Sequence, residues 1–187
     1  MIRTFIGGLA GGLAMYMVGF IFWGTPLNRI AFTGLGETQS AAVQQALAAN
    51  LTQTGTGSYA IPWMGTQSGT TLYGKGPIAL VHFNTHGFPV MDSAALLAGL
   101  ILALFSALII AFALRAIAPH VADFANRAKL VIAFSLAIPL YVDIGQPIFN
   151  HAPWPYYIYS FLCDSIGFAV AGLIVARWFL SEGRQVE

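Results

Sequence analysis

The fold of this chain is decided by residues 93–117, which read SAALLAGLILALFSALIIAFALRAI. After Ser93, only Ser106 and Arg115 interrupt the apolar run. A helix that crosses the hydrocarbon core of a bilayer needs about 20 predominantly apolar residues. The stretch therefore predicts a membrane-spanning helix, and with it an integral membrane protein.

Three further stretches meet the same criterion, at about 5–23, 130–149 and 157–180. Of the 187 residues, 57% are hydrophobic and only 8% are charged, whereas charged residues make up about 25% of a typical soluble domain. We therefore predict an all-α membrane protein, with a four-helix transmembrane bundle as the core of one integral membrane domain over 1–187. The lipid bilayer is the expected partner of this surface. A formal net charge of +1 offers no basic field for nucleic acid.

Residues 25–91, between the first two spans, form a longer segment than an ordinary connection. Val43, Leu47 and Leu51 recur at four-residue spacing and predict a short amphipathic helix over 38–51. Residues 59–63 and 78–83 have the composition of two short strands, so a β-hairpin is possible, and 66–70 are interpreted as a polar loop. The segment is expected to be a small mixed cap rather than an independent domain.

The basic residues predict the orientation of the spans, because cytoplasmic loops carry an excess of Lys and Arg. Two of the eight basic residues, Arg29 and Lys75, lie in the long segment at 25–91. The other six flank the opposite ends of the spans: Arg3, Arg115, Arg127, Lys129, Arg177 and Arg184. Both termini are therefore expected in the cytoplasm, and the 25–91 loop in the periplasm of a bacterial inner membrane.

Small residues recur at four-residue spacing along three of the predicted spans. Helices in lipid approach each other closely where such residues meet, since lipid supplies no hydrophobic force between them. The candidates for helix packing are Gly8, Gly12, Gly99, Ala103, Ala107, Gly167 and Ala171. Contacts inside the bundle and contacts with another subunit both fit this pattern.

Two carboxylates, Asp143 and Asp164, lie within the third and fourth predicted spans. Ionisable residues at such depth are costly and mark candidate functional sites. Because the two helices form a hairpin, we expect both side chains at one depth, where they could share a proton, bind a cation or hold a polar ligand. Alternatively, each carboxylate only fixes the hairpin by a local hydrogen bond. Polar residues expected to line the same pocket are Tyr141, Gln146, Asn150, His151 and Tyr157.

Histidines provide the remaining candidates for a metal site. His82 and His86 would point to one side of a strand, so they are candidate metal ligands, although polar surface residues fit the pattern better. Cys163 is the only cysteine, which excludes an intramolecular disulfide and a cysteine-built metal centre. No cofactor is predicted.

The chain also resembles a group of four-helix bacterial inner-membrane proteins with a periplasmic loop between the first two helices. The resemblance lies in a Gly-rich first span that ends in Trp23, in Tyr59-Ala60-Ile61-Pro62, in Gly76-Pro77-Ile78-Ala79, and in an acidic closing helix pair. It implies the topology and the inner-membrane location, and it implies no activity.

Three classes of function fit these features, and no catalytic motif is present. The first is an accessory subunit of a larger membrane complex of respiratory or photosynthetic type, which implies other membrane subunits as partners. The second is a protein that binds or moves a small ligand, a cation or a proton through the Asp143/Asp164 pocket. The third is a membrane enzyme that uses the carboxylate pair as general acid and base.

Overall fold

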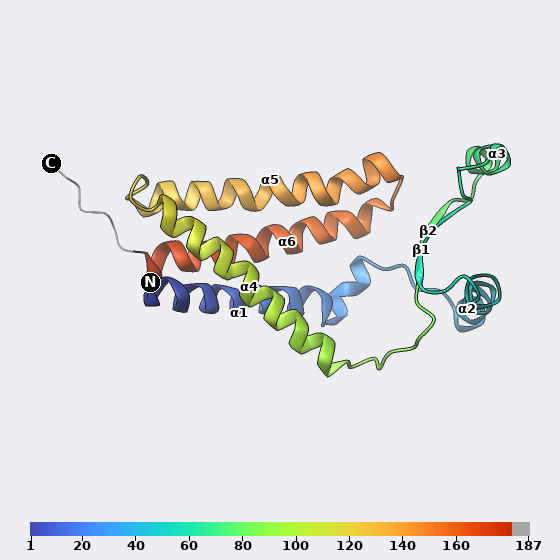
Figure 1. Ribbon diagram of the computed structural model, residues 1–187, viewed down its shortest axis with the longest axis horizontal. Coiled ribbons are helices and arrows are strands. Elements are labelled where there is room, and N and C mark those ends of the chain that lie inside the picture. Colours follow the sequence, from blue (N-terminus) through green and yellow to red (C-terminus); the bar gives the residue numbers. More distant parts are fainter. Residues whose placement is uncertain (181–187) are drawn as a thin grey trace. The chain divides into compact units, whose positions relative to one another are not determined.

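The computed structural model describes residues 1–180, so Arg184 lies outside the described residues. Four long helices dominate it: α1 (Ile2–Trp23), α4 (Ser93–Ile117), α5 (Phe124–Asn150) and α6 (Trp154–Ile174) (Figure 1). A π-helical turn, η2 (Val175–Phe179), extends α6. All four spans are long and apolar enough to cross a membrane. The predicted all-α bundle is confirmed, and the chain is a multi-pass membrane protein.

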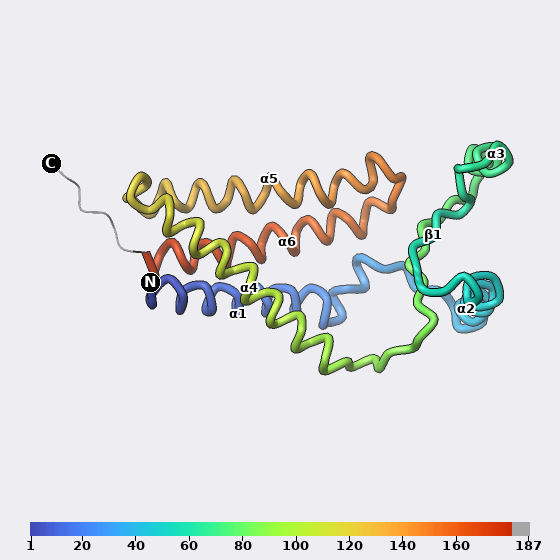
Figure 2. Tube along the Cα trace, viewed as in Figure 1, coloured from blue at the N-terminus to red at the C-terminus, as the bar shows by residue number. Residues whose placement is uncertain are grey.

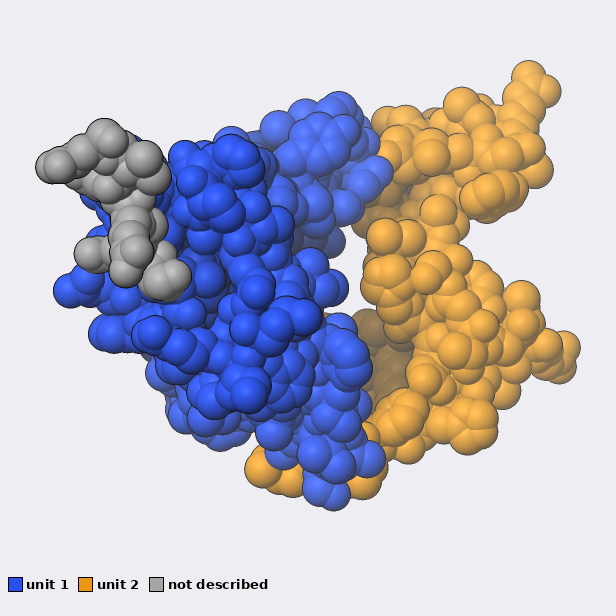
Figure 3. All heavy atoms as spheres, turned by 60° about the vertical axis from the view of Figure 1, so that its left-hand side comes forward, with its two compact units in different colours: residues 1–33, 93–187 blue, residues 34–92 orange. Residues whose placement is uncertain are grey.

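The chain forms two compact units, coloured separately in Figure 3. One contains the four long helices and begins with Met1–Thr33, which includes the short 3-10 helix η1 (Pro26–Ile30). We call it the membrane unit. The other is Gly34–Asp92, which we call the outer unit. The sequence predicts a small cap within one domain, and that division stays a prediction.

Helix α1 packs against α4 through glycines. A Cβ atom added at Gly8 would lie 2.7 Å from Cδ2 of Leu108, and one added at Gly12 would lie 2.7 Å from Cα of Leu104. The opposing face of α4 is small as well, with Ala103, Ala107 and Ala111 buried. The trace in Figure 2 shows α4 crossing α1. Only residues without a larger side chain allow the two backbones to come so close.

Helix α6 contacts the other side of α1. A Cβ atom at Gly11 would lie 2.9 Å from the carbonyl oxygen of Ala171, and one at Gly167 would lie 3.3 Å from Cγ of Met15. Gly99 differs, because its nearest neighbour would be the Tyr16 ring at 3.7 Å, an ordinary contact. Apart from Gly99, the small residues singled out in the sequence therefore have close neighbours within this one chain.

Helices α5 and α6 form an antiparallel hairpin, visible at the top of Figure 1. A Cβ atom at Gly172 would lie 2.6 Å from Cγ1 of Val131. Two prolines stand inside α5, and a proline leaves the carbonyl four residues earlier without its helical donor. The buried residues of α5 follow one narrow stripe: Arg127, Val131, Ser135, Pro139, Asp143 and Pro147.

Basic side chains tie together the end of the bundle where α4 meets α5, which we call the basic end. Arg3 Nη2 donates to the carbonyl of Trp178 at 3.2 Å, and Arg115 Nη1 donates to Thr4 Oγ1 at 3.3 Å. Arg127 is 1% exposed, and its Nε donates to the carbonyl of Val121 at 2.7 Å. Arg177 lies over the Phe124 ring. Four of the basic residues used to predict the orientation therefore also make contacts within the bundle.

Asp123 caps the start of α5. Its Oδ1 accepts from the backbone N–H of Asn126 at 2.9 Å, and its Oδ2 accepts from the Asn126 side chain at 2.7 Å. The backbone hydrogen bond, followed by the side-chain bond, lowers the pKa of the Asp123 carboxyl. Such a cap satisfies donors that a helix leaves unpaired in its first turn.

The outer unit contains α2 (Glu37–Leu51), β1 (Gly57–Ile61), α3 (Gln67–Lys75) and β2 (Ala79–Phe83). The strands form the predicted hairpin, with Tyr59 opposite Val81. Helix α3 corrects the interpretation of 66–70 as a polar loop. Thr66 supplies the cap that the sequence reading missed, since its Oγ1 accepts from the backbone N–H of Gly69 at 3.0 Å.

Candidate functional site

Asp143 lies on α5 and Asp164 on α6, at positions that differ by about one helical turn along the hairpin. Counting along both helices from the contact of Val131 with Gly172 places Asp143 level with Ser160. Asp164 is four residues further along α6, or about 6 Å nearer the basic end. The expected single depth is therefore offset by one turn.

Asp143 is the buried member of this pair. It is 8% exposed, and its Oδ2 has no hydrogen-bond partner among the described residues. Pro147 also leaves the backbone carbonyl of Asp143 without its helical donor. An unpaired carboxylate in such a place is costly, so the group favours a proton, a cation or a hydrogen-bond donor as its partner.

Asp164 is the exposed member. It lies ten residues after Trp154, the first residue of α6, which is about 15 Å along the helix and so about half of a hydrocarbon core of about 30 Å. An ionisable carboxyl group at that depth in a span is costly. The position therefore favours a polar or cationic partner for the carboxyl group.

The other residues predicted for the pocket have local contacts of their own, and their role as a pocket lining stays a prediction. Tyr141 is 77% exposed. Asn150 Nδ2 donates to Oε1 of Gln146 at 2.7 Å, so these two bond to each other. His151 ends α5 in the left-handed conformation, with φ of 53°. Tyr157 contacts the ring of Tyr156, with centroids 5.0 Å apart.

Sequence reasoning missed a buried aromatic contact beside the hairpin. Tyr159 is 6% exposed, and its hydroxyl donates to the carbonyl of Phe22 at 2.6 Å. Its ring lies 5.1 Å from those of Phe22 and Trp23. This contact joins α6 to the end of α1, and the only sequence signal for it was the aromatic pair that closes the first span.

Ser165 was also missed. It is 6% exposed, and its Oγ is the second buried side-chain atom without a partner among residues 1–180. The residue follows Asp164 directly, which was the available signal. Buried polar atoms without partners are rare in native proteins, so the hairpin concentrates unsatisfied polar groups near its middle.

The two histidine candidates lie in the outer unit and bond to hydroxyl groups. His82 Nδ1 is 2.8 Å from Ser58 Oγ across the hairpin, and His86 Nδ1 is 3.1 Å from Thr85 Oγ1. His86 stands beyond the last residue of β2, so the two do not share a strand face. Residues 1–180 contain no group of three side chains suited to hold a metal ion.

The outer unit has an unusual surface. Throughout its residues, all of which the structure describes, no hydrophobic side chain is buried. Trp63, Leu80 and Phe88 are 68%, 60% and 66% exposed. Single exposed apolar side chains are common on protein surfaces, so the lack of a buried one is the more informative observation.

No protein-family model matches the chain, and no curated protein or solved structure matches it. The four apolar helices agree with the topology of the group that the sequence resembles. Membership of that group stays a prediction.

Proposed function

We propose that this chain is an accessory subunit of a larger membrane complex, of respiratory or photosynthetic type. The observation that carries the proposal is the outer unit's lack of any buried hydrophobic side chain. A unit of about 60 residues is marginal even with a core of its own. In this proposal, contact with other subunits buries the apolar side chains of the outer unit.

Asp164 supports the same function from within the membrane. Its carboxyl group is exposed at about half the depth of the bilayer. A neighbouring span that brings a basic side chain or a hydroxyl group would satisfy it, since intramembrane polar residues pair with one another. Most of the small residues named above pack inside the chain, so Asp164 and the outer unit are the stronger candidates for contact with other subunits.

The proposed setting is a bacterial inner membrane with both termini in the cytoplasm. Five of the residues that bear on orientation lie at the basic end: Arg3, Arg115, Arg127, Lys129 and Arg177. The excess of Lys and Arg on cytoplasmic loops supports this orientation. The outer unit would then lie in the periplasm.

The test is purification of the tagged full chain from native membranes in mild detergent, with partners quantified by mass spectrometry. The triple variant Trp63→Ser, Leu80→Ser, Phe88→Ser is expected to lose a wild-type partner by about tenfold or more. The matched control replaces exposed polar residues of the same unit by serine: Gln44→Ser, Gln53→Ser and Lys75→Ser. A chain that purifies alone, or partners kept by the first triple variant, would contradict the proposal.

A second candidate function, binding or transfer of a proton or cation, is favoured by the unpartnered Oδ2 of Asp143. The reporter is Trp23, whose ring lies 5.1 Å from Tyr159 on α6. Wild-type protein is expected to change its tryptophan fluorescence with pH or with added cation, and Asp143→Asn to lose that change while staying folded. Asp123→Asn, outside the span, is the control. If Asp143→Asn fails to assemble, the carboxyl group is structural.

A further inference from the structure

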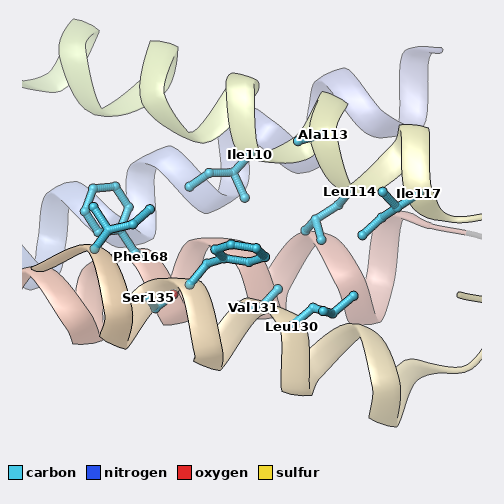
Figure 4. A pocket seen from close by; sticks show the side chains of 10 residues that line it. Ile110, Ala113, Leu114, Ile117, Leu130, Val131, Ser135 and Phe168 are labelled. Carbon is cyan, nitrogen blue, oxygen red and sulfur yellow. The ribbon is translucent and has the colours of Figure 1, made fainter. Parts of the chain in front are cut away.

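A cavity of about 330 Å³ lies between α4 and α5, at the lower end of the range of small-molecule sites, roughly 300–1,000 Å³. Figure 4 shows Ile110, Leu114 and Ile117 directed from α4 toward α5, with Phe168 of α6 beside them. Among all lining residues, Ser135 alone has a polar side chain. The cavity is therefore suited to an apolar ligand.

The cavity is elongated along the helices. On α4 it extends from Ile117, the last residue of the helix, to Ile110, and on α5 from Leu130 to Ile138. At 1.5 Å per residue these stretches are about 10 Å and 12 Å long. The cavity thus begins at the helix ends, where head groups of a bilayer lie, and runs toward the middle of the membrane.

The open side of the cavity is continuous with the lipid-facing surface. Phe134 and Ile138, which line it, are 63% and 57% exposed, and Ala113 is exposed as well. Ile109, the neighbour of Ile110 on α4, is 71% exposed. Because these residues belong to membrane spans, lipid chains are the molecules that reach the opening.

Charge at the adjoining end of the bundle suits a lipid head group. Asp123 is the acidic side chain there among residues 1–180, against four exposed basic ones: Arg3, Arg115, Lys129 and Arg177. Basic clusters at the ends of spans attract anionic lipids. We propose that the cavity binds one acyl chain of a membrane phospholipid, with the head group at the basic end.

The test uses the purified full chain and native mass spectrometry, with dioleoyl phosphatidylglycerol as the probe. Ala113→Phe places a ring at the cavity and is expected to weaken lipid retention by about tenfold. Ala116→Phe is the matched control, because this exposed alanine three residues away on α4 does not line the cavity. Equal lipid retention by the two variants would overturn the proposal.

A second arm leaves the protein unchanged, in case Ala113→Phe does not fold. Phosphatidylglycerol with six-carbon chains has the same head group but cannot extend through a cavity about 10–12 Å long. Wild-type protein is expected to retain the dioleoyl lipid at least about tenfold more strongly. Equal retention of both lipids would show that the head group alone is bound, and would contradict occupation of the cavity.

Discussion

The membrane unit and the outer unit differ in how their side chains are buried. In the membrane unit, Gly12 brings α1 against the backbone of α4 at Leu104, and Ala107 and Ala171 are fully buried. In the outer unit two helices and a hairpin form without one buried hydrophobic side chain. The comparison shows that the helices and strands of the outer unit form without a buried apolar core of their own.

The largest expected effect comes from disrupting the close contact between α1 and α4 in the membrane unit. Gly12→Leu would force a side chain into Leu104 Cα and the Ala103 carbonyl, 2.7 and 2.9 Å from the new Cβ. We expect a loss of about 3 kcal/mol in the free energy of unfolding, as for severe overpacking, measured by thermal unfolding in detergent. Gly19→Leu on the same helix is the control, since nothing lies within 4 Å of its Cβ position. Equal loss in both variants would refute the close contact.

A smaller loss is expected from Arg127→Gln at the basic end. Its guanidinium donates to the carbonyls of Val121 and Ala118, at 2.7 and 3.4 Å. Removing charged hydrogen bonds of this kind costs about 2 kcal/mol. Lys129→Gln, at an exposed site two residues away, is expected to leave the unfolding temperature nearly unchanged. Equal unfolding temperatures of the two variants would show that the buried hydrogen bonds of Arg127 contribute nothing to stability.

A pH-dependent effect is expected at Asp123. Because the hydrogen bonds from Asn126 lower its pKa in the folded state, its stabilisation is present above the unfolded pKa of about 3.9 and is lost as pH falls through the folded value. Asp123→Ala should therefore lower the unfolding temperature at pH 6 and have progressively less effect below pH 4. An effect of constant size between pH 6 and pH 3 would contradict the cap.

The smallest effect on stability is expected in the outer unit. Leu80→Ser removes an apolar side chain that is 60% exposed. We expect a change within about 0.5 kcal/mol in the isolated chain, as at ordinary surface positions. Val131→Ser, at a buried site of the membrane unit, is the comparison and should cost several times more. A large loss for Leu80→Ser would reveal a core in the outer unit.

The bundle could be predicted from the sequence because span length and apolar composition are local properties, and the runs around Leu100 and Val170 display both. The glycine spacing on α1 was compatible with packing inside the bundle and with packing against another subunit, since spacing does not identify the opposing helix. The polar site was harder to predict. Tyr141 shares a helix with Asp143, but the rotation of α5 turns it outward, and the offset of one turn to Asp164 depends on how Gly172 meets Val131.

Helix α3 shows a different limit. Gly69 and Gly74 lower the helix propensity of 67–75, but the Thr66 side chain accepts from the backbone N–H of Gly69 and caps the helix. Likewise, the four-residue spacing of Val43, Leu47 and Leu51 predicted α2, but spacing does not show whether the apolar side finds a partner. No residue of α2 is buried.

Hydrogen exchange tests the central claim most directly, with the full chain in detergent, in liposomes of lipid alone and in native membranes. The account predicts that α1, α4, α5 and α6 are protected in all three settings. Residues 34–92 should gain protection only in native membranes, where partner subunits are present. Equal protection of 34–92 in detergent, or full protection by lipid alone, would contradict the dependence of the outer unit on a protein partner.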